Sequence, residues 1–197
     1  MKPLALDPGA YTGTYKRIAG RTSLDLVNTV SWPNTERHHD WLELPDNLVR
    51  WLEASGLETH GLEVGTDDLE AIRTLRRDLD ALLRPLAHDR HPPPEALERF
   101  AHHLQDALPR RHIDPETLGW SWSVPRNPIE ALAPVIFDAA ELMAHGDRKR
   151  LRACPACDWL FEDQTRNGRR RWCDMADCGS RDKARRYYRK SRREPSP

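Results

Sequence analysis

All four cysteines of this 197-residue chain lie between positions 154 and 178, and their spacing constrains how this region can fold. They form two pairs, CPAC at 154–157 and CDMADC at 173–178, with 15 residues between the pairs. Two short-range cysteine pairs joined by a loop can place four thiolates in a tetrahedron around one Zn²⁺. A basic segment of about fifty residues cannot easily build its own core, so bound metal would supply folding free energy. The sequence predicts one structural zinc held by Cys154, Cys157, Cys173 and Cys178.

Three other uses of these cysteines fit the pattern less well. Disulfides are disfavoured because the N-terminal MKPLALDPGAY lacks the apolar stretch of a secretion signal, so we expect a cytoplasmic protein with reduced thiols. A C-P-x-C redox motif would follow a hydrophobic strand, whereas CPAC follows a predicted helix. A catalytic zinc keeps one coordination position open, and four cysteines would close it.

Charge is distributed unevenly along the chain, although the formal net charge is zero. Residues 148–197 carry 16 Lys and Arg against 7 Asp and Glu, whereas residues 1–147 carry 15 against 24. A basic module attached to an acidic body indicates a surface that faces nucleic acid. The same asymmetry also fits an acidic body and a basic tail that dock on each other.

Apolar periodicity predicts helices through most of residues 1–147. In the clearest one, about 67–87, leucine and isoleucine recur at steps of three and four residues. Asp46 is a plausible N-cap for the helix that follows it. The other predicted helices start near Thr22 or span about 46–55, 94–108 and 129–143.

One segment changes period. Leu118, Trp120, Trp122 and Val124 alternate with small or polar residues, which predicts a strand with one buried face. Turn residues precede it, so we expect a short hairpin with residues near 110–113. The predicted fold is mainly α with a short β-hairpin: a helical N-terminal domain over 1–147 and a small C-terminal zinc-binding module with four cysteine ligands over 148–197, which ends in a basic helix.

The basic helix follows the last cysteine directly. From Asp182 the chain has no glycine or proline until Pro195, which predicts about ten helical residues leaving the metal site. We expect Ala184, Tyr187, Tyr188 and Ser191 to pack on the zinc knuckles, with the basic residues on other faces. The final SRREPSP is expected to be disordered.

A basic face backed by an apolar anchor suits a helix pressed against phosphates. We therefore expect double-stranded DNA as the partner. RNA is a further alternative, because Trp172, Tyr187 and Tyr188 could stack on bases. The candidate nucleic-acid contacts are Arg169, Arg170, Arg171, Arg181, Lys183, Arg185, Arg186 and Arg189.

The stretch CPACDWLFEDQTRNGRRRWCDMADCGSRDKARRYYRK resembles the CGNR-type zinc finger. That pattern joins C-x2-C, Leu-Phe and Asp, a Ser/Thr-Arg-Asn stretch, Arg-Arg-Trp-Cys, and Cys-Gly-Asn-Arg followed by Lys. Ser180 stands where the family has its name-giving asparagine, and serine has a shorter hydrogen-bonding reach. The matching positions outside the cysteines are Leu160, Phe161, Asp163, Thr165, Arg166, Asn167, Arg170, Arg171, Trp172, Gly179, Arg181 and Lys183.

In that family the finger usually follows a mostly helical ABATE-type domain. LDLVNTVSW near the N-terminus resembles the start of such a domain, with matches at Leu24, Asp25, Asn28 and Thr29. The resemblance implies a stress-responsive bacterial transcriptional regulator.

A DNA-binding finger on an acidic helical domain raises the hypothesis that the larger domain senses a small molecule or a protein effector. Asp25, Asn28 and Thr29 are the candidate ligand-binding residues. The same side chains could instead hydrogen-bond to backbone groups at a helix end.

Other functional classes lack sequence support. No glycine-rich phosphate loop, nucleophile elbow or HExxH motif is present, so we do not expect an enzyme. The adjacent pairs His38-His39 and His102-His103 would diverge by about 100° on a helix and cannot converge on one ion. No apolar run is long enough to cross a bilayer, so no membrane partner is expected.

Two hypotheses remain for the whole chain. The first is a cytoplasmic, zinc-dependent DNA-binding transcription regulator, compatible with a homodimer that pairs half-sites. The second is a protein-interaction adaptor whose basic helix docks on an acidic partner or on the chain's own acidic body. They differ in whether the arginines pair with carboxylates of residues 1–147.

Overall fold

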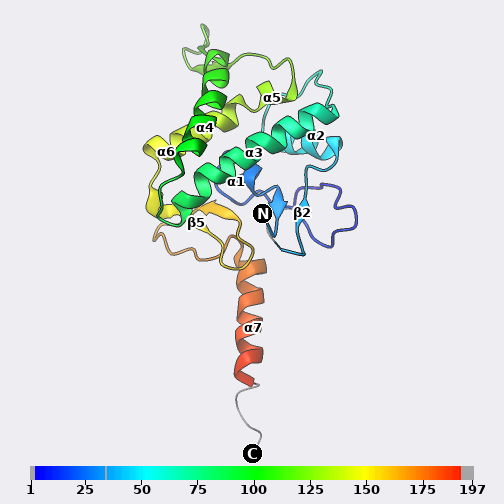
Figure 1. Cartoon of the computed structure of the whole chain (residues 1–197), viewed down its shortest axis with the longest axis vertical. Helices are drawn as coiled ribbons and strands as arrows, with labels where there is room; N and C mark the ends of the chain where they lie inside the picture. The colour runs from blue at the N-terminus through cyan, green and yellow to red at the C-terminus, as the bar shows by residue number, and fades with distance from the viewer. Residues whose placement is uncertain (1–2, 34, 192–197) are drawn as a thin grey trace, which may run out of the picture.

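The computed structural model describes residues 3–33 and 35–191, and it confirms the mainly α fold (Figure 1). The expectation of disorder for SRREPSP falls outside the described residues, except for Ser191, which ends the last helix. The α-helices are α1 (Thr22–Val27), α2 (Pro45–Ala54), α3 (Thr66–Ala87), α4 (Pro94–Ala107), α5 (Pro128–Ala131), α6 (Ala133–His145) and α7 (Ser180–Ser191). Single turns of other helix types span Leu108–Arg110, Arg148–Arg150 and Met175–Gly179.

Three antiparallel two-stranded sheets accompany the helices. β1 (Val30–Ser31) pairs with β2 (His39–Asp40), β3 (Arg111–Ile113) with β4 (Trp120–Trp122), and β5 (Leu151–Ala153) with β6 (Leu160–Glu162). Only the β3–β4 hairpin was expected from the sequence, because apolar alternation runs past β4 over residues 118–124, whereas the other strands lack such a run. The strand β5 directly precedes Cys154, so the expectation that CPAC follows a helix was wrong. No helix in the described ranges is long and apolar enough to cross a membrane.

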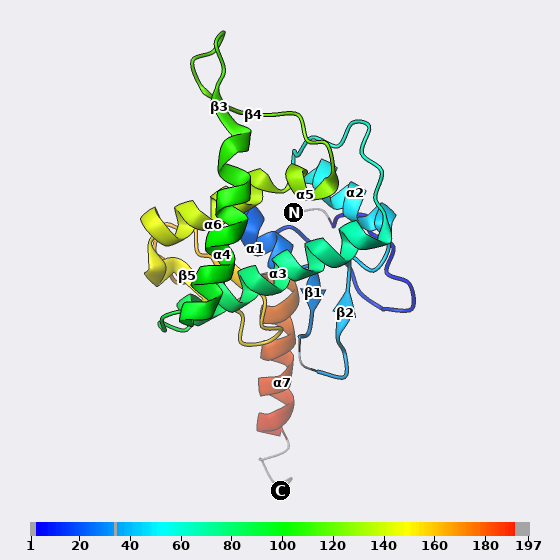
Figure 2. The same cartoon turned by 45° about the horizontal axis from the view of Figure 1, so that its top comes forward.

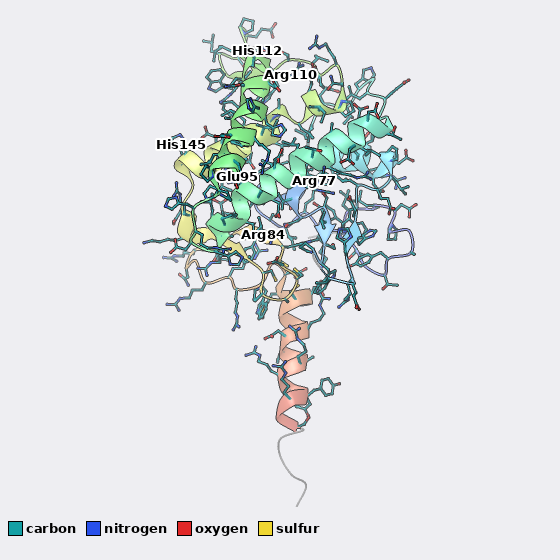
Figure 3. The ribbon with its side chains drawn as sticks, in the orientation of Figure 1. Arg77, Arg84, Glu95, Arg110, His112 and His145 are labelled. Atoms are coloured by element: carbon teal, nitrogen blue, oxygen red, sulfur yellow. The ribbon has the colours of Figure 1, made fainter. Side chains whose placement is uncertain are left out.

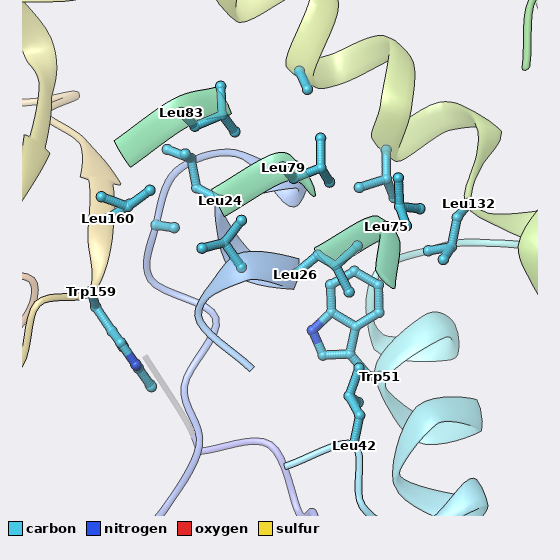
Figure 4. Close-up of a cluster of buried hydrophobic side chains, with 14 of the residues drawn as sticks. Leu24, Leu26, Leu42, Trp51, Leu75, Leu79, Leu83, Leu132, Trp159 and Leu160 are labelled. Carbon is cyan, nitrogen blue, oxygen red and sulfur yellow. The ribbon is translucent and has the colours of Figure 1, made fainter. Parts of the chain in front are cut away.

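Helix α3 is the centre of the hydrophobic core. Its apolar residues repeat at helical spacing and are buried on the face that meets α1, α4 and β5 (Figures 1 and 2). Leu24 of α1, Leu79 of α3 and Leu160 of β6 belong to one cluster of buried side chains (Figure 4). The core therefore includes residues from both the 1–147 and the 148–197 segments.

Two local expectations were wrong. Asp46 is not the N-cap of its helix: α2 begins at Pro45, since proline's fixed φ suits the first helical position. The strand at Trp120–Trp122 does not have a fully buried face. Leu118, Trp120 and Val124 are exposed, because the β3–β4 hairpin extends beyond the helices instead of packing on them (Figure 2).

Asn28 joins the two segments through a buried pair of hydrogen bonds. Its Nδ2 donates to the Leu160 carbonyl over 2.8 Å, and its Oδ1 accepts from the Leu160 N–H over 2.9 Å. A side-chain amide thus satisfies both polar backbone groups of one residue in β6. Buried backbone groups need such partners, so this contact fixes the position of the zinc segment against α1.

Other contacts extend the same junction. The Trp159 indole N–H donates to the Val30 carbonyl over 3.0 Å. At the end of α3, the Arg84 guanidinium binds both the carbonyl and the carboxylate of Asp158, at 2.8 and 2.7 Å. The zinc segment is therefore packed into the body on several sides and is not a separately tethered module.

We expect Asn28→Ala to lower the free energy of unfolding by about 2–4 kcal/mol, because it leaves the Leu160 N–H and carbonyl buried without partners. Denaturant unfolding followed by near-UV circular dichroism measures the change. Asn167→Ala removes an exposed amide and is the matched control, with an expected change below about 0.5 kcal/mol. An equal stability of both variants would contradict the role of Asn28.

Candidate metal centre and basic surface

The four cysteine sulfurs converge on one point. All four side chains are buried, and their Sγ atoms lie within 4.8 Å of one another. Cys157 and Cys173 have sulfurs 3.4 Å apart, and those of Cys173 and Cys178 are 3.6 Å apart. These distances exceed an S–S bond of about 2.05 Å, and the cysteines are free. They match the edge of a tetrahedron with Zn–S bonds of about 2.3 Å.

The four sulfurs interact strongly with one another. Hydrogen bonding among them raises the pKa of Cys157 and Cys173 and lowers the pKa of Cys154 and Cys178. Four thiolates in contact repel one another, and a divalent ion removes that repulsion. Four soft sulfur donors with no oxygen or open position are the ligand set of a structural zinc.

Backbone geometry explains how the first cysteine pair forms a tight knuckle. The Cys154 N–H donates to the Trp159 carbonyl and the Asp158 N–H donates to the Cys154 carbonyl, each over 2.8 Å. Asp158 has φ of 65°, a left-handed conformation in which aspartate is tolerated better than most residues. The turn folds the chain back so that Cys157 faces the second pair.

The second pair depends on close packing at Gly179. A Cβ atom at this position would lie 2.7 Å from the Met175 Sδ and 3.1 Å from the Trp172 Cδ1. Trp172 is buried beside the metal centre, so a larger residue would push against its ring. Ser180 then starts α7 and donates to the Met175 carbonyl over 3.3 Å.

Asp163 organises the loop between the cysteine pairs. Its carboxylate accepts from the Thr165 N–H and hydroxyl, at 2.9 and 2.6 Å, and from the Arg170 N–H at 2.7 Å. Burial alone would raise the pKa of Asp163, but these hydrogen bonds outweigh it and hold the pKa below its usual value. The carboxylate thus stays charged and keeps the arginine-bearing loop in one conformation.

Arg170 stabilises the loop between the cysteine pairs through its contacts with the rest of the chain. Its guanidinium lies 4.6 Å from the Phe161 ring centre and donates to the backbone carbonyls of Ile18, Trp172 and Cys173. Arg169, in contrast, is exposed, and exposed Arg171 lies over the Trp172 ring. Sequence alone could not separate these three adjacent arginines, since each is equally basic.

Arg181 links α7 to the metal centre. Its guanidinium donates to the Cys178 Sγ over 3.5 Å and pairs with Asp177 at 3.0 Å. It also lies 5.1 Å from the Trp32 ring centre, and Arg37 lies 4.4 Å from the same ring. Cations near thiolates offset part of the negative charge of a zinc centre with four thiolate ligands. Trp32 and Arg37 were not assigned to this site from sequence, because they lie more than 110 positions before the first cysteine.

Helix α7 projects from the body, with its side chains standing out around it (Figures 1 and 3). Tyr187 and Tyr188 are 71% and 68% exposed, so the expectation that they pack on the zinc knuckles was wrong. The helix leaves the body immediately after its first turn, and no knuckle lies beside the tyrosines. Lys183, Arg185, Arg186 and Arg189 are not buried either.

The three candidate ligand-binding residues occupy different environments. The Asn28 side-chain amide binds both backbone polar groups of Leu160. The Thr29 hydroxyl donates to the Leu26 carbonyl and accepts from Arg76. Asp25 is buried, accepts from the Ala19 N–H over 3.0 Å, and lies 3.7 Å from the Arg17 Nε. Asp25 lines a cavity with a volume of about 900 Å³.

Two family models match the chain. Residues 20–146 match the ABATE model, which is described as "Putative stress-induced transcription regulator". The chain belongs to the ABATE family. Residues 150–191 of this ABATE protein match the CGNR zinc finger, so both resemblances seen in the sequence are confirmed. A search of curated proteins found no match.

The family match and the geometry of the cysteines agree on the metal. This ABATE protein binds one structural zinc through Cys154, Cys157, Cys173 and Cys178. Neither matched model describes an enzyme family.

Cys173→Ser should release the zinc and unfold the chain, because three thiolates hold the ion weakly and the metal centre shares its core with α3. Metal content by mass spectrometry and near-UV circular dichroism measure the two effects. The control Ser180→Ala should keep one zinc per chain. A folded, zinc-loaded Cys173→Ser variant would contradict the four-cysteine site.

Asp25 should make the folded state more stable at lower pH. Burial raises its pKa from 3.8 to about 6, so between these values the folded chain binds a proton that the unfolded chain has lost. Stability from this group therefore falls as pH rises towards 6. Between pH 5 and 7.5, wild type should lose about 1 kcal/mol more than Asp25→Asn in denaturant unfolding. Glu53→Gln, an exposed change, should follow wild type; parallel curves for all three would contradict the shift.

Proposed function

We propose that this protein is a cytoplasmic, zinc-dependent regulator of transcription that binds double-stranded DNA through α7 and the adjacent arginine loop. The observation that carries the proposal is that α7 is a basic helix that starts two residues after the last zinc ligand and projects from the body (Figure 1). The ABATE family description and the zinc finger match support a regulatory role.

The dimensions of α7 suit a DNA groove. Its 12 residues make a rod about 18 Å long, and a helix with side chains is about 10–12 Å wide. The major groove of B-DNA is about 12 Å wide and admits such a helix. Arg181, Arg185 and Arg189 recur every four residues and form one row along the rod.

Charges on α7 are available to a partner. In the described part of the chain, no ion pair joins the candidate nucleic-acid contacts to an acidic residue of 1–147. Among the described residues, Arg185 and Arg186 form ion pairs with Asp182 of the same helix, at 3.6 and 2.9 Å. Both arginine side chains are exposed, and ion pairs at the surface contribute little, so phosphates can replace Asp182 as their partner. This favours an external anionic partner over docking on the chain's own acidic body.

We assign the DNA contacts to the accessible members of the predicted set and the positioning of the loop to Arg170. The proposed contacts are Arg169, Arg171, Arg181, Lys183, Arg185, Arg186 and Arg189. If about six phosphates are neutralised, the logarithm of affinity falls with the logarithm of salt concentration at a slope near −5.

The proposed effector site is the cavity that Asp25 lines. Arg21 also lines this cavity and forms ion pairs with Asp138 of α6 at 3.2 Å and with Glu162 of β6 at 3.1 Å. A small polar effector there would touch both the helical body and the zinc segment. Binding could therefore change how the finger is held.

The double variant Arg185→Ala/Arg189→Ala should keep its zinc and its fold but lose affinity for random-sequence duplex DNA. Removing two phosphate contacts should also reduce the salt slope by about 2. Fluorescence anisotropy over a salt series measures both effects. Arg77→Ala is the matched control, because Arg77 is an exposed arginine on α3, away from α7, that pairs with Glu70 (Figure 3).

A flat salt dependence in wild type would contradict DNA binding. Displacement of the duplex by an equal charge concentration of poly-glutamate would indicate the adaptor function instead. Tighter binding to single-stranded RNA than to duplex DNA would favour an RNA-binding module.

A further inference from the structure

Exposed apolar side chains gather at the end of the molecule opposite α7. Half of the ten large apolar or tyrosine side chains that are exposed in the described residues lie between positions 108 and 124. This segment contains the β3–β4 hairpin, which projects beyond the helices (Figures 1 and 2). The members of this apolar tip are Leu108, Ile113, Leu118, Trp120 and Val124.

Leu118 is a costly residue for a free hairpin. Its φ is 54°, a left-handed conformation that costs a β-carbon residue roughly 1 kcal/mol, and its side chain is 77% exposed. Glycine or asparagine would fit this turn better. Hydrogen bonds of the turn, including the Leu118 N–H to the Asp114 carbonyl at 2.9 Å, hold this backbone conformation, but they leave the Leu118 side chain uncovered. The side chain is therefore suited to a contact outside the monomer.

The apolar face continues from the core to the tip of the hairpin. Trp122 packs edge-on against Phe137 of α6, with ring centres 5.5 Å apart. The Arg111 guanidinium lies 4.2 Å from both the Phe137 and the Trp120 ring centres. Trp120, which is next on this face, is 63% exposed. The row of aromatic rings is therefore packed on α6 at Trp122 and exposed to solvent at Trp120.

Charge on the hairpin is arranged with opposite signs at its two ends. At the base, Arg111 has no ion pair in the described part of the chain, and its buried Nε has no hydrogen-bond partner. At the turn, Glu116 is exposed and likewise has no ion pair among these residues. Asp114 is used within the turn, accepting from the Glu116 and Thr117 N–H groups.

We propose that this hairpin is a dimerisation surface for a second copy of the chain. In an antiparallel arrangement of two hairpins about a two-fold axis, the acidic turn of one lies beside the basic base of the other. Each Glu116 then meets the other copy's arginine at the hairpin base, and the Trp120 rings are covered. The same arrangement brings together two sheets of only two strands, a size that is marginal alone.

This dimer differs from a DNA-induced pairing of half-sites. The hairpin, marked by Arg110 and His112, lies at the end opposite α7 (Figure 3). The two α7 helices would therefore point away from the interface, and dimerisation would not depend on nucleic acid. The inference stands apart from the proposed DNA binding.

Sedimentation of the full zinc-loaded chain over a concentration series, without DNA, tests the proposal. Wild type should approach twice 22.8 kDa, whereas Trp120→Ser should dissociate at least tenfold more readily. Leu44→Ser removes an exposed leucine elsewhere and should behave as wild type. Zinc content and thermal unfolding confirm that each variant is folded.

Charge reversal tests the assigned partner. Glu116→Arg should be monomeric, because both of its hairpin ends are basic. Mixing it with Arg111→Glu chains should restore a dimer of one chain of each kind, since every cation then meets a carboxylate. If Arg111→Glu fails to fold, Arg111→Gln replaces it, and dimer formation in the mixture should exceed that of Glu116→Arg alone.

A wild-type chain that stays monomeric at all concentrations would overturn the proposal. So would a dimer that Trp120→Ser and Glu116→Arg leave intact. Loss of dimer with unchanged affinity for a short duplex separates this surface from the DNA-binding surface.

Discussion

Sulfur coordination of one zinc ion is the interaction on which the rest of this structure depends. Four buried cysteine sulfurs cannot remain together as thiolates without a cation, and the ion fixes both ends of the loop that carries the arginines. The Asp163 carboxylate then holds the interior of that loop. Metal binding therefore determines both the conformation of the arginine loop and the position of the first turn of α7.

That arrangement also completes the larger domain. Asn28, Trp159 and Arg84 connect the zinc segment to α1, β1 and α3, and Leu160 lies in the common core. The ABATE match ends at residue 146 and the zinc finger match begins at residue 150, but this division in sequence does not separate two hydrophobic cores. In physical terms the two segments share one hydrophobic interior, so a change at the metal can reach the helices through packed contacts.

The sequence predicts the metal ligands well, because four thiols at these spacings have few other uses. It also predicts the long helix α3, since leucines at three- and four-residue steps have a clear period. It does not distinguish Arg170 from Arg169, because the difference arises from a carbonyl of Ile18 that is distant in sequence. The same limit applies to Tyr187 and Trp120: alternation and helical spacing identify one face of an element, but only tertiary structure shows whether anything covers it.

The Asn28–Leu160 contact has a consequence for how the chain is made. Its two partners are 132 residues apart, so the interior of the first segment stays incomplete until most of the polypeptide has been translated. A nascent chain that ends before β6 would expose Leu24 and Leu79 to chaperones and proteases. Zinc binding in the newly made segment then completes the shared hydrophobic interior, so folding of the helices and loading of the metal are coupled.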